Sequence, residues 1–279
     1  MRKRNVLGTV LILCSQLTIA NTQVDKGLSI YQNSSAEIRI EQFSTQIQKQ
    51  FSSTFQNEQE GNADVQSQIL SAIKNTYQPK HFEKHILDEI DSTLNWHERK
   101  KIVQWLDTPL GRKASLAEAL ALMNANRNGI NATIDTAKGL ESASKAALVD
   151  IAELAAMESA LQMDITVFQS SVSAFAANAP QSRSTANDYN FYKTTTESRR
   201  AEIATLNKNF SRSMLAIAYS DFSKSEVKSI ISFWGSPTGT RYSVALRRGI
   251  KNAFDEANQK FNDDVSKIIS ASTLASSAG

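Results

Sequence analysis

The chain is poor in the residues that separate the strands of β-sheet proteins. Its 279 residues include only ten glycines and four prolines, so the frequent turns of a sandwich or barrel lack their usual signals. Hydrophobic residues (41%) and charged residues (21%) occur at ordinary levels, which excludes a wholly disordered or collagen-like chain. The composition favours an all-α protein.

Cysteine is almost absent. The one cysteine, Cys14, follows an apolar run over residues 6–13, and that run is preceded by Arg-Lys-Arg at residues 2–4. A basic segment, an apolar segment and small residues in this order predict a secretory signal peptide over residues 1–20. Leu13 before Cys14 does not fit a lipid-attachment site. The rest of the chain has no thiol, and so no disulfide, thiolate nucleophile or zinc–sulfur site.

An excess of positive charge is also missing once this leader is set aside. The formal charge is +3, and residues 1–20 hold three cations and no carboxylate, so 28 cations face 28 carboxylates in the remainder. A nucleic-acid-binding surface needs a concentrated basic patch, and only short pairs such as Arg199-Arg200 are present. We expect a periplasmic or secreted protein that binds no nucleic acid and does not span the membrane after signal cleavage.

Apolar residues three or four positions apart predict a series of amphipathic helices. The predicted helices and their limits are, in order, residues 40–55, residues 65–77 after Gly61-Asn62, a helix opened by Pro79, a helix capped by Asn95 and Glu98, and a helix from Thr108-Pro109 to about Arg127. Between Leu140 and Phe175, nine of eleven heptad seam positions are apolar, which predicts a long helix. It would pair as an antiparallel hairpin with a second run over residues 192–217, or alternatively with a second chain as a homodimer.

An offset of 128 residues aligns residues 80–119 with residues 208–247. The matched residues are Glu98 with Glu226, Trp105 with Phe233, Thr108 with Ser236, Pro109 with Pro237, and Gly111 with Gly239. The acidic residues would cap one helix, the Ser/Thr-Pro pairs would begin the next, the aromatic residues would fill the angle, and the glycines would allow close backbone approach. The repeated unit is predicted to be a helical corner.

The predicted architecture is a helical bundle with two such corner lobes joined by the long hairpin. Its segments are a signal peptide over residues 1–20, an N-terminal lobe over 21–130, the heptad-patterned helix and linker over 131–188, a C-terminal lobe over 189–270, and a disordered tail over 271–279.

The corner motif resembles that of a bacterial family of exported helical proteins classified as a domain of unknown function. The first copy runs from Glu98 through Trp105-Leu106 and Thr108-Pro109-Leu110-Gly111 to Arg112, and the second from Glu226 through Phe233-Trp234 and Ser236-Pro237-Thr238-Gly239 to Arg241. The second copy departs from the family pattern at Thr240, where a cation is expected. The resemblance implies a helical fold and export, and it assigns no catalytic residue.

Metal chemistry has one candidate group. His81, His85 and Glu89 are spaced four residues apart on a predicted helix, so all three could share one face as ligands of a divalent ion. The second copy has Asn209 and Ser213 instead of the histidines, so the corner itself does not require them.

Catalytic patterns are missing from the sequence. Ser236 lies one place too early for a Gly-x-Ser-x-Gly elbow, and no phosphate-binding loop is present. Arg112 and Arg241, near the starts of two helices, could contact an anion or a partner. The sequence thus favours a protein without cofactor or enzymatic activity that binds or scaffolds a protein or peptide, with metal binding and homodimerisation as alternatives.

Overall fold

A computed structural model describes residues 26–56, 63–138, 140 and 198–277. These residues form α-helices and no strand, which confirms the all-α class. The signal peptide and nearly all of the predicted heptad helix lie outside the described residues. The long hairpin and the seam-mediated homodimer therefore stay predictions.

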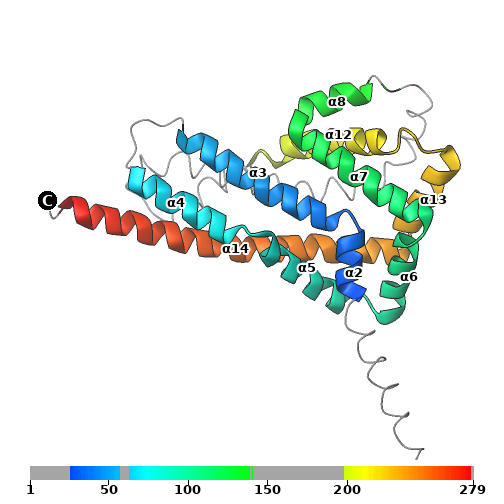
Figure 1. Cartoon of the computed structure of the whole chain (residues 1–279), viewed down its shortest axis with the longest axis horizontal. Helices are drawn as coiled ribbons and strands as arrows, with labels where there is room; N and C mark the ends of the chain where they lie inside the picture. The colour runs from blue at the N-terminus through cyan, green and yellow to red at the C-terminus, as the bar shows by residue number, and fades with distance from the viewer. Residues whose placement is uncertain (1–25, 57–62, 139, 141–197, 278–279) are drawn as a thin grey trace, which may run out of the picture.

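The described helices are shown in chain order in Figure 1. They are α2 (Lys26–Asn33), α3 (Ala36–Gln56), α4 (Ala63–Thr76), α5 (Pro79–Thr93), α6 (Trp96–Leu106), α7 (Pro109–Asn128), α8 (Ile130–Lys138), α12 (Arg200–Ala218), α13 (Lys224–Trp234) and α14 (Pro237–Ser277).

The helices predicted between residues 40 and 127 are present as α3 to α7. Gly129, with φ of 87°, ends α7, because glycine adopts this left-handed region without a steric cost. The short helices α2 and α8 were not predicted. The prediction of a disordered tail from residue 271 is wrong for residues 271–277, since α14 continues to Ser277. No proline or glycine interrupts the helix there, and alanine favours it.

The larger hydrophobic core combines the two ends of the described chain. Its buried residues come from α2 to α6 and from α14, whose long axis runs beside α5 and α4 (Figure 1). Phe43, Phe82 and Phe254 meet there, with ring centroids 4.6 to 5.5 Å apart. The N-terminal and C-terminal segments therefore share one core, where the sequence had assigned them to separate lobes.

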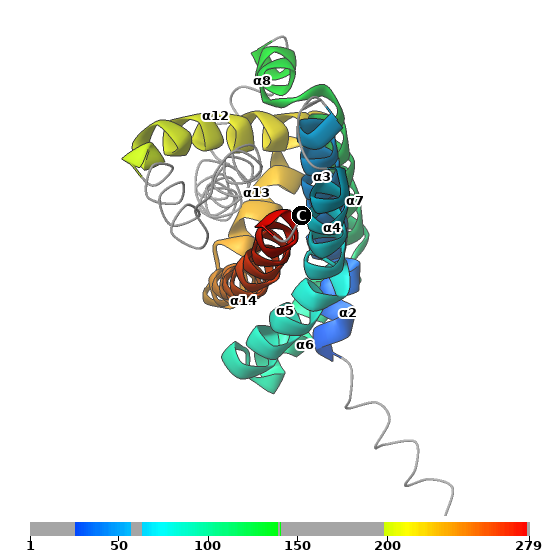
Figure 2. The ribbon, with the colours of Figure 1, turned by 90° about the vertical axis from the view of Figure 1, so that its left-hand side faces the viewer.

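A second core lies between α7, α12 and α13. Buried residues of α7, α12 and α13 pack against one another, including Leu122, Met214 and Ile230. Figure 2 shows α12 crossing the molecule at the end that carries α8 and α7. Trp105 and Trp234 contact both cores and so join them.

Small residues let α14 approach α5 closely. Ala245, Gly249, Ala253 and Ala257 recur every four residues on α14 and are all buried. A Cβ atom on Gly249 would lie 2.6 Å from Ile86 Cα, so glycine is required at this crossing. Within the described helices, none combines the length and the apolar composition that a membrane span requires.

Candidate functional site

The two helical corners are built from the residues that the sequence pattern singled out. Asn95 caps α6 by accepting a hydrogen bond from the Glu98 N–H (3.0 Å), and the Glu98 carboxylate accepts one from the Asn95 N–H (2.9 Å). Ser223 and Glu226 form the same reciprocal capping box at α13. Each first helix of a corner thus begins with two of its otherwise free N–H groups satisfied.

Each corner then turns at a Ser/Thr-Pro pair. The Thr108 hydroxyl accepts from the Gly111 N–H (2.9 Å) and donates to the Trp105 carbonyl (2.7 Å). The Ser236 hydroxyl accepts from the Gly239 N–H (3.2 Å) and donates to the Phe233 carbonyl (2.6 Å). Pro109 and Pro237 are the first residues of α7 and α14, where a missing N–H has no cost.

The glycines of both corners face backbone atoms. A Cβ on Gly111 would lie 2.0 Å from the Trp105 carbonyl oxygen. A Cβ on Gly239 would lie 2.4 Å from the Trp234 carbonyl oxygen. Both distances are far below van der Waals contact, so neither corner can close around a larger residue.

The two corners pack directly on each other. Trp105 and Phe233, which occupy matching places in the 128-residue alignment, stack with centroids 4.5 Å apart and planes inclined by 12°. Lys113 of the first corner pairs with Glu226 of the second at 3.0 Å, and Arg241 of the second pairs with Glu98 of the first at 3.1 Å. Matching residues make matching contacts, so the corners form an approximately two-fold internal pair.

The contacts of the two corners change the role predicted for Arg112 and Arg241, which the sequence offered as contacts for an anion or a partner. Arg241 aligns with Lys113, not with Arg112, and its guanidinium also donates to the Thr93 carbonyl. Arg112 donates to the Asp107 carbonyl of its own corner. The ion pair of Lys113 was not predicted from the sequence, although the 128-residue offset aligns Lys113 with Arg241. Lys113 and Arg241 therefore link the two corners through ion pairs, and Arg112 forms a hydrogen bond within its own corner.

The capping glutamate of the second corner makes the pair sensitive to acid. The Ser223 backbone N–H, the Lys113 ammonium and the Ser223 hydroxyl hold the pKa of Glu226 at about 2, below the ordinary 4.5. Since the folded-state pKa is the lower one, ionised Glu226 stabilises the fold above about pH 4.5. That contribution is lost as the pH falls toward 2.

Glu226→Gln should therefore lower the free energy of unfolding at pH 6, with the difference from the wild type vanishing near pH 2. Denaturant titrations at pH 2 to 6 measure this. Asp135→Asn is a control, because Asp135 pairs with Lys138 within one helix, through side chains that are both about 70% exposed. A difference that stays constant with pH would contradict the assignment.

The histidines lie on α5 and face α14. Within the described residues, His81, His85 and Glu256 form a group of potential metal ligands whose donor atoms all lie within 4.8 Å of one another. Glu89, the third ligand predicted from sequence, does not belong to this group, because its carboxylate accepts a hydrogen bond from the Asn252 amide (2.9 Å). The acidic partner comes from another helix, which helical spacing along α5 could not indicate.

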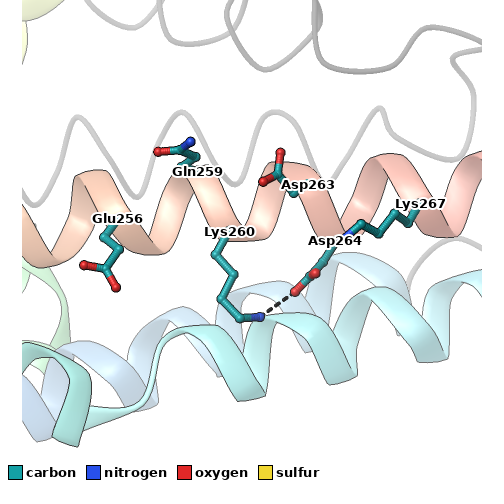
Figure 3. Close-up of a pocket in the computed structure, with 6 residues that line it drawn as sticks. All are labelled: Glu256, Gln259, Lys260, Asp263, Asp264 and Lys267. Carbon is teal, nitrogen blue, oxygen red and sulfur yellow. Dashed lines mark hydrogen bonds and ion pairs between the residues drawn. The ribbon is translucent and has the colours of Figure 1, made fainter.

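Neither Ser236 nor the surface groove offers catalytic geometry. The Ser236 hydroxyl is committed to its helix cap, as described above. An open groove runs along α14 beside a row of charged and polar side chains (Figure 3). The six lining residues that the structure describes all belong to this one helix, and Lys260 and Asp264 pair with each other at 2.5 Å.

Comparison with known proteins gives no relative: no family model, curated protein or solved structure matches the chain.

Proposed function

We propose that this is an exported, non-catalytic helical protein that binds or scaffolds a partner protein in the bacterial envelope. The paired corners support a scaffolding role, because the residues that the two copies share form helix caps, a ring stack and ion pairs. Export is inferred from the basic and apolar N-terminal residues of the sequence.

The outward face of α7 carries this proposal. Leu116 is 60% exposed and Leu120 is 50% exposed, and they are the two most exposed large hydrophobic side chains of the described residues. They lie one helical turn apart, and the exposed Arg112 lies one turn before them. An apolar helix stripe next to a cation suits an amphipathic partner helix that bears carboxylates.

The opposite face of α7 holds the helix in place. Ala114, Ala121 and Leu122 are buried in the second core with α12 and α13. The exposed leucines are therefore presented by a helix anchored on its other side, and binding would require little ordering of α7 itself.

Photo-crosslinking in intact cells tests the proposal. A photoreactive residue at position 116 should give one discrete adduct, and mass spectrometry should map it to an amphipathic segment rich in Asp or Glu. Leu120→Glu should abolish that adduct through charge repulsion and loss of apolar contact. The same photoreactive residue at Lys228, an exposed position on α13, is the control.

Three results would overturn the proposal. These are the absence of any adduct, identical adducts from positions 116 and 228, and an adduct that Leu120→Glu leaves intact. An adduct between two copies of this chain would instead indicate self-association through α7, a different surface from the predicted seam over residues 140–175, and would also contradict a separate partner on α7.

A further inference from the structure

We propose that His81, His85 and Glu256 bind one divalent transition-metal ion of the zinc class, with a coordination position left open to water or an external ligand. Two imidazole nitrogens and one carboxylate are a common donor set for such ions. The proposal is independent of partner binding on α7, because it concerns the α5–α14 interface.

The donor atoms are already close to coordinating distance from a common point. In a tetrahedral zinc site, with metal–ligand distances near 2.1 Å, donors lie about 3.4 Å apart. Here His85 Nε2 lies 3.0 Å from Glu256 Oε2, and all three donors lie within 4.8 Å of one another. Small changes of side-chain rotamer would bring the donors to a shared ion.

The contact between His85 and Glu256 lacks the alignment of a hydrogen bond. His85 Nε2 is buried and has no hydrogen-bond partner among the described residues, although the carboxylate is within ion-pair distance. A buried nitrogen without a hydrogen bond is costly. An ion between the two groups would satisfy the nitrogen and the carboxylate together.

His81 is oriented by a backbone contact typical of metal-binding histidines. Its Nε2 lies 3.1 Å from the Ala253 carbonyl oxygen. A carbonyl only accepts, so Nε2 carries the proton and the lone pair is on Nδ1. A ring nitrogen that donates to a carbonyl fixes the tautomer and leaves the other nitrogen available to a metal.

Helix packing and exposure make the site reachable. The buried Gly249 and Ala253 allow α14 to approach α5, which brings Glu256 to the histidines. The His85 side chain is 17% exposed, whereas that of Glu256 is 64% exposed. The ion would enter from the solvent side, past the carboxylate.

Cobalt(II) and zinc titrations of the purified protein test the site. The expected result is saturable binding of one Co²⁺ per chain, with visible absorption bands of a low-coordinate site that Zn²⁺ displaces. His85→Ala should abolish these bands, and Glu256→Gln should weaken Co²⁺ binding at least about tenfold, the lower bound for loss of even an outer-shell partner. Because Glu256 is exposed, its replacement leaves the fold intact, as circular dichroism would verify.

Two matched controls separate this site from adventitious binding. Glu89→Gln changes the carboxylate predicted from the sequence, and His97→Ala removes the third histidine, which is exposed on α6. Both variants should bind Co²⁺ as the wild type does. The proposal is overturned if the protein binds no Co²⁺ or Zn²⁺ saturably, if Glu256→Gln binds normally, or if His97→Ala loses the bands. In those cases His81, His85 and Glu256 contribute only to the packing of α5 against α14.

Discussion

Gly111→Ala is expected to destabilise the protein by at least about 3 kcal/mol. In an ordinary helix this change would stabilise by up to about 1 kcal/mol, because alanine is the better helix former. Here the new Cβ would lie 2.0 Å from the Trp105 carbonyl oxygen, a backbone atom that cannot rotate away. The corner would have to open, which separates Trp105 from Phe233.

Thermal and denaturant unfolding measure this effect. Because a kilocalorie corresponds to about 2–4 °C in a chain of this size class, the melting temperature should fall by roughly 6–12 °C. Gly27→Ala is the matched control, since the atoms nearest to its Cβ would be side-chain atoms, the Asp91 carboxylate oxygen at 3.1 Å and Ile90 Cγ2 at 3.7 Å, and no backbone atom. Equal effects of the two changes would show that the corner tolerates a side chain.

Phe254→Ala is expected to cost about 3–5 kcal/mol, the usual range for a buried phenylalanine. Phe254 is 3% exposed and lies on α14, and its ring meets Phe43 at 4.6 Å and Phe82 at 4.8 Å. One truncation would thus leave a cavity among three helices that are distant in sequence.

Amide hydrogen exchange tests whether α3, α5 and α14 share one hydrophobic core. If α3, α5 and α14 form one cooperative unit, Phe254→Ala should reduce amide protection in all three helices by a similar factor. Leu116→Ala, a truncation at a 60% exposed position, should change stability by less than about 0.5 kcal/mol. Loss of protection confined to α14 would show that the N-terminal and C-terminal segments are separate lobes after all.

Local features of the corners could be read from the sequence because their causes are local. The Asn95 and Glu98 capping box spans four residues, and the cap of Thr108 on Gly111 also spans four. Such contacts depend on spacing and side-chain chemistry alone. The pairing of the two corners was not predicted, because stacking of Trp105 on Phe233 joins residues 128 positions apart.

The candidate metal site also combines residues that local spacing predicts with a residue that only tertiary packing brings in. Helical spacing placed His81 and His85 on one face of α5, and the same spacing suggested Glu89. The third donor, Glu256, depends on how α14 crosses α5, and that crossing depends on the close approach at Gly249.

By itself, the sequence determined the helical class, the presence and approximate positions of α3 to α7 and the capped turns of both corners, because helix periodicity and capping act over a few residues. Only the tertiary structure decided that α14 packs in the core of the N-terminal helices and that Glu256 lies beside His81 and His85. It also decided that Lys113 and Arg241 form equivalent ion pairs between the two corners. These outcomes depend on which surfaces bury each other, and burial brings together residues whose separation along the chain carries no local signal.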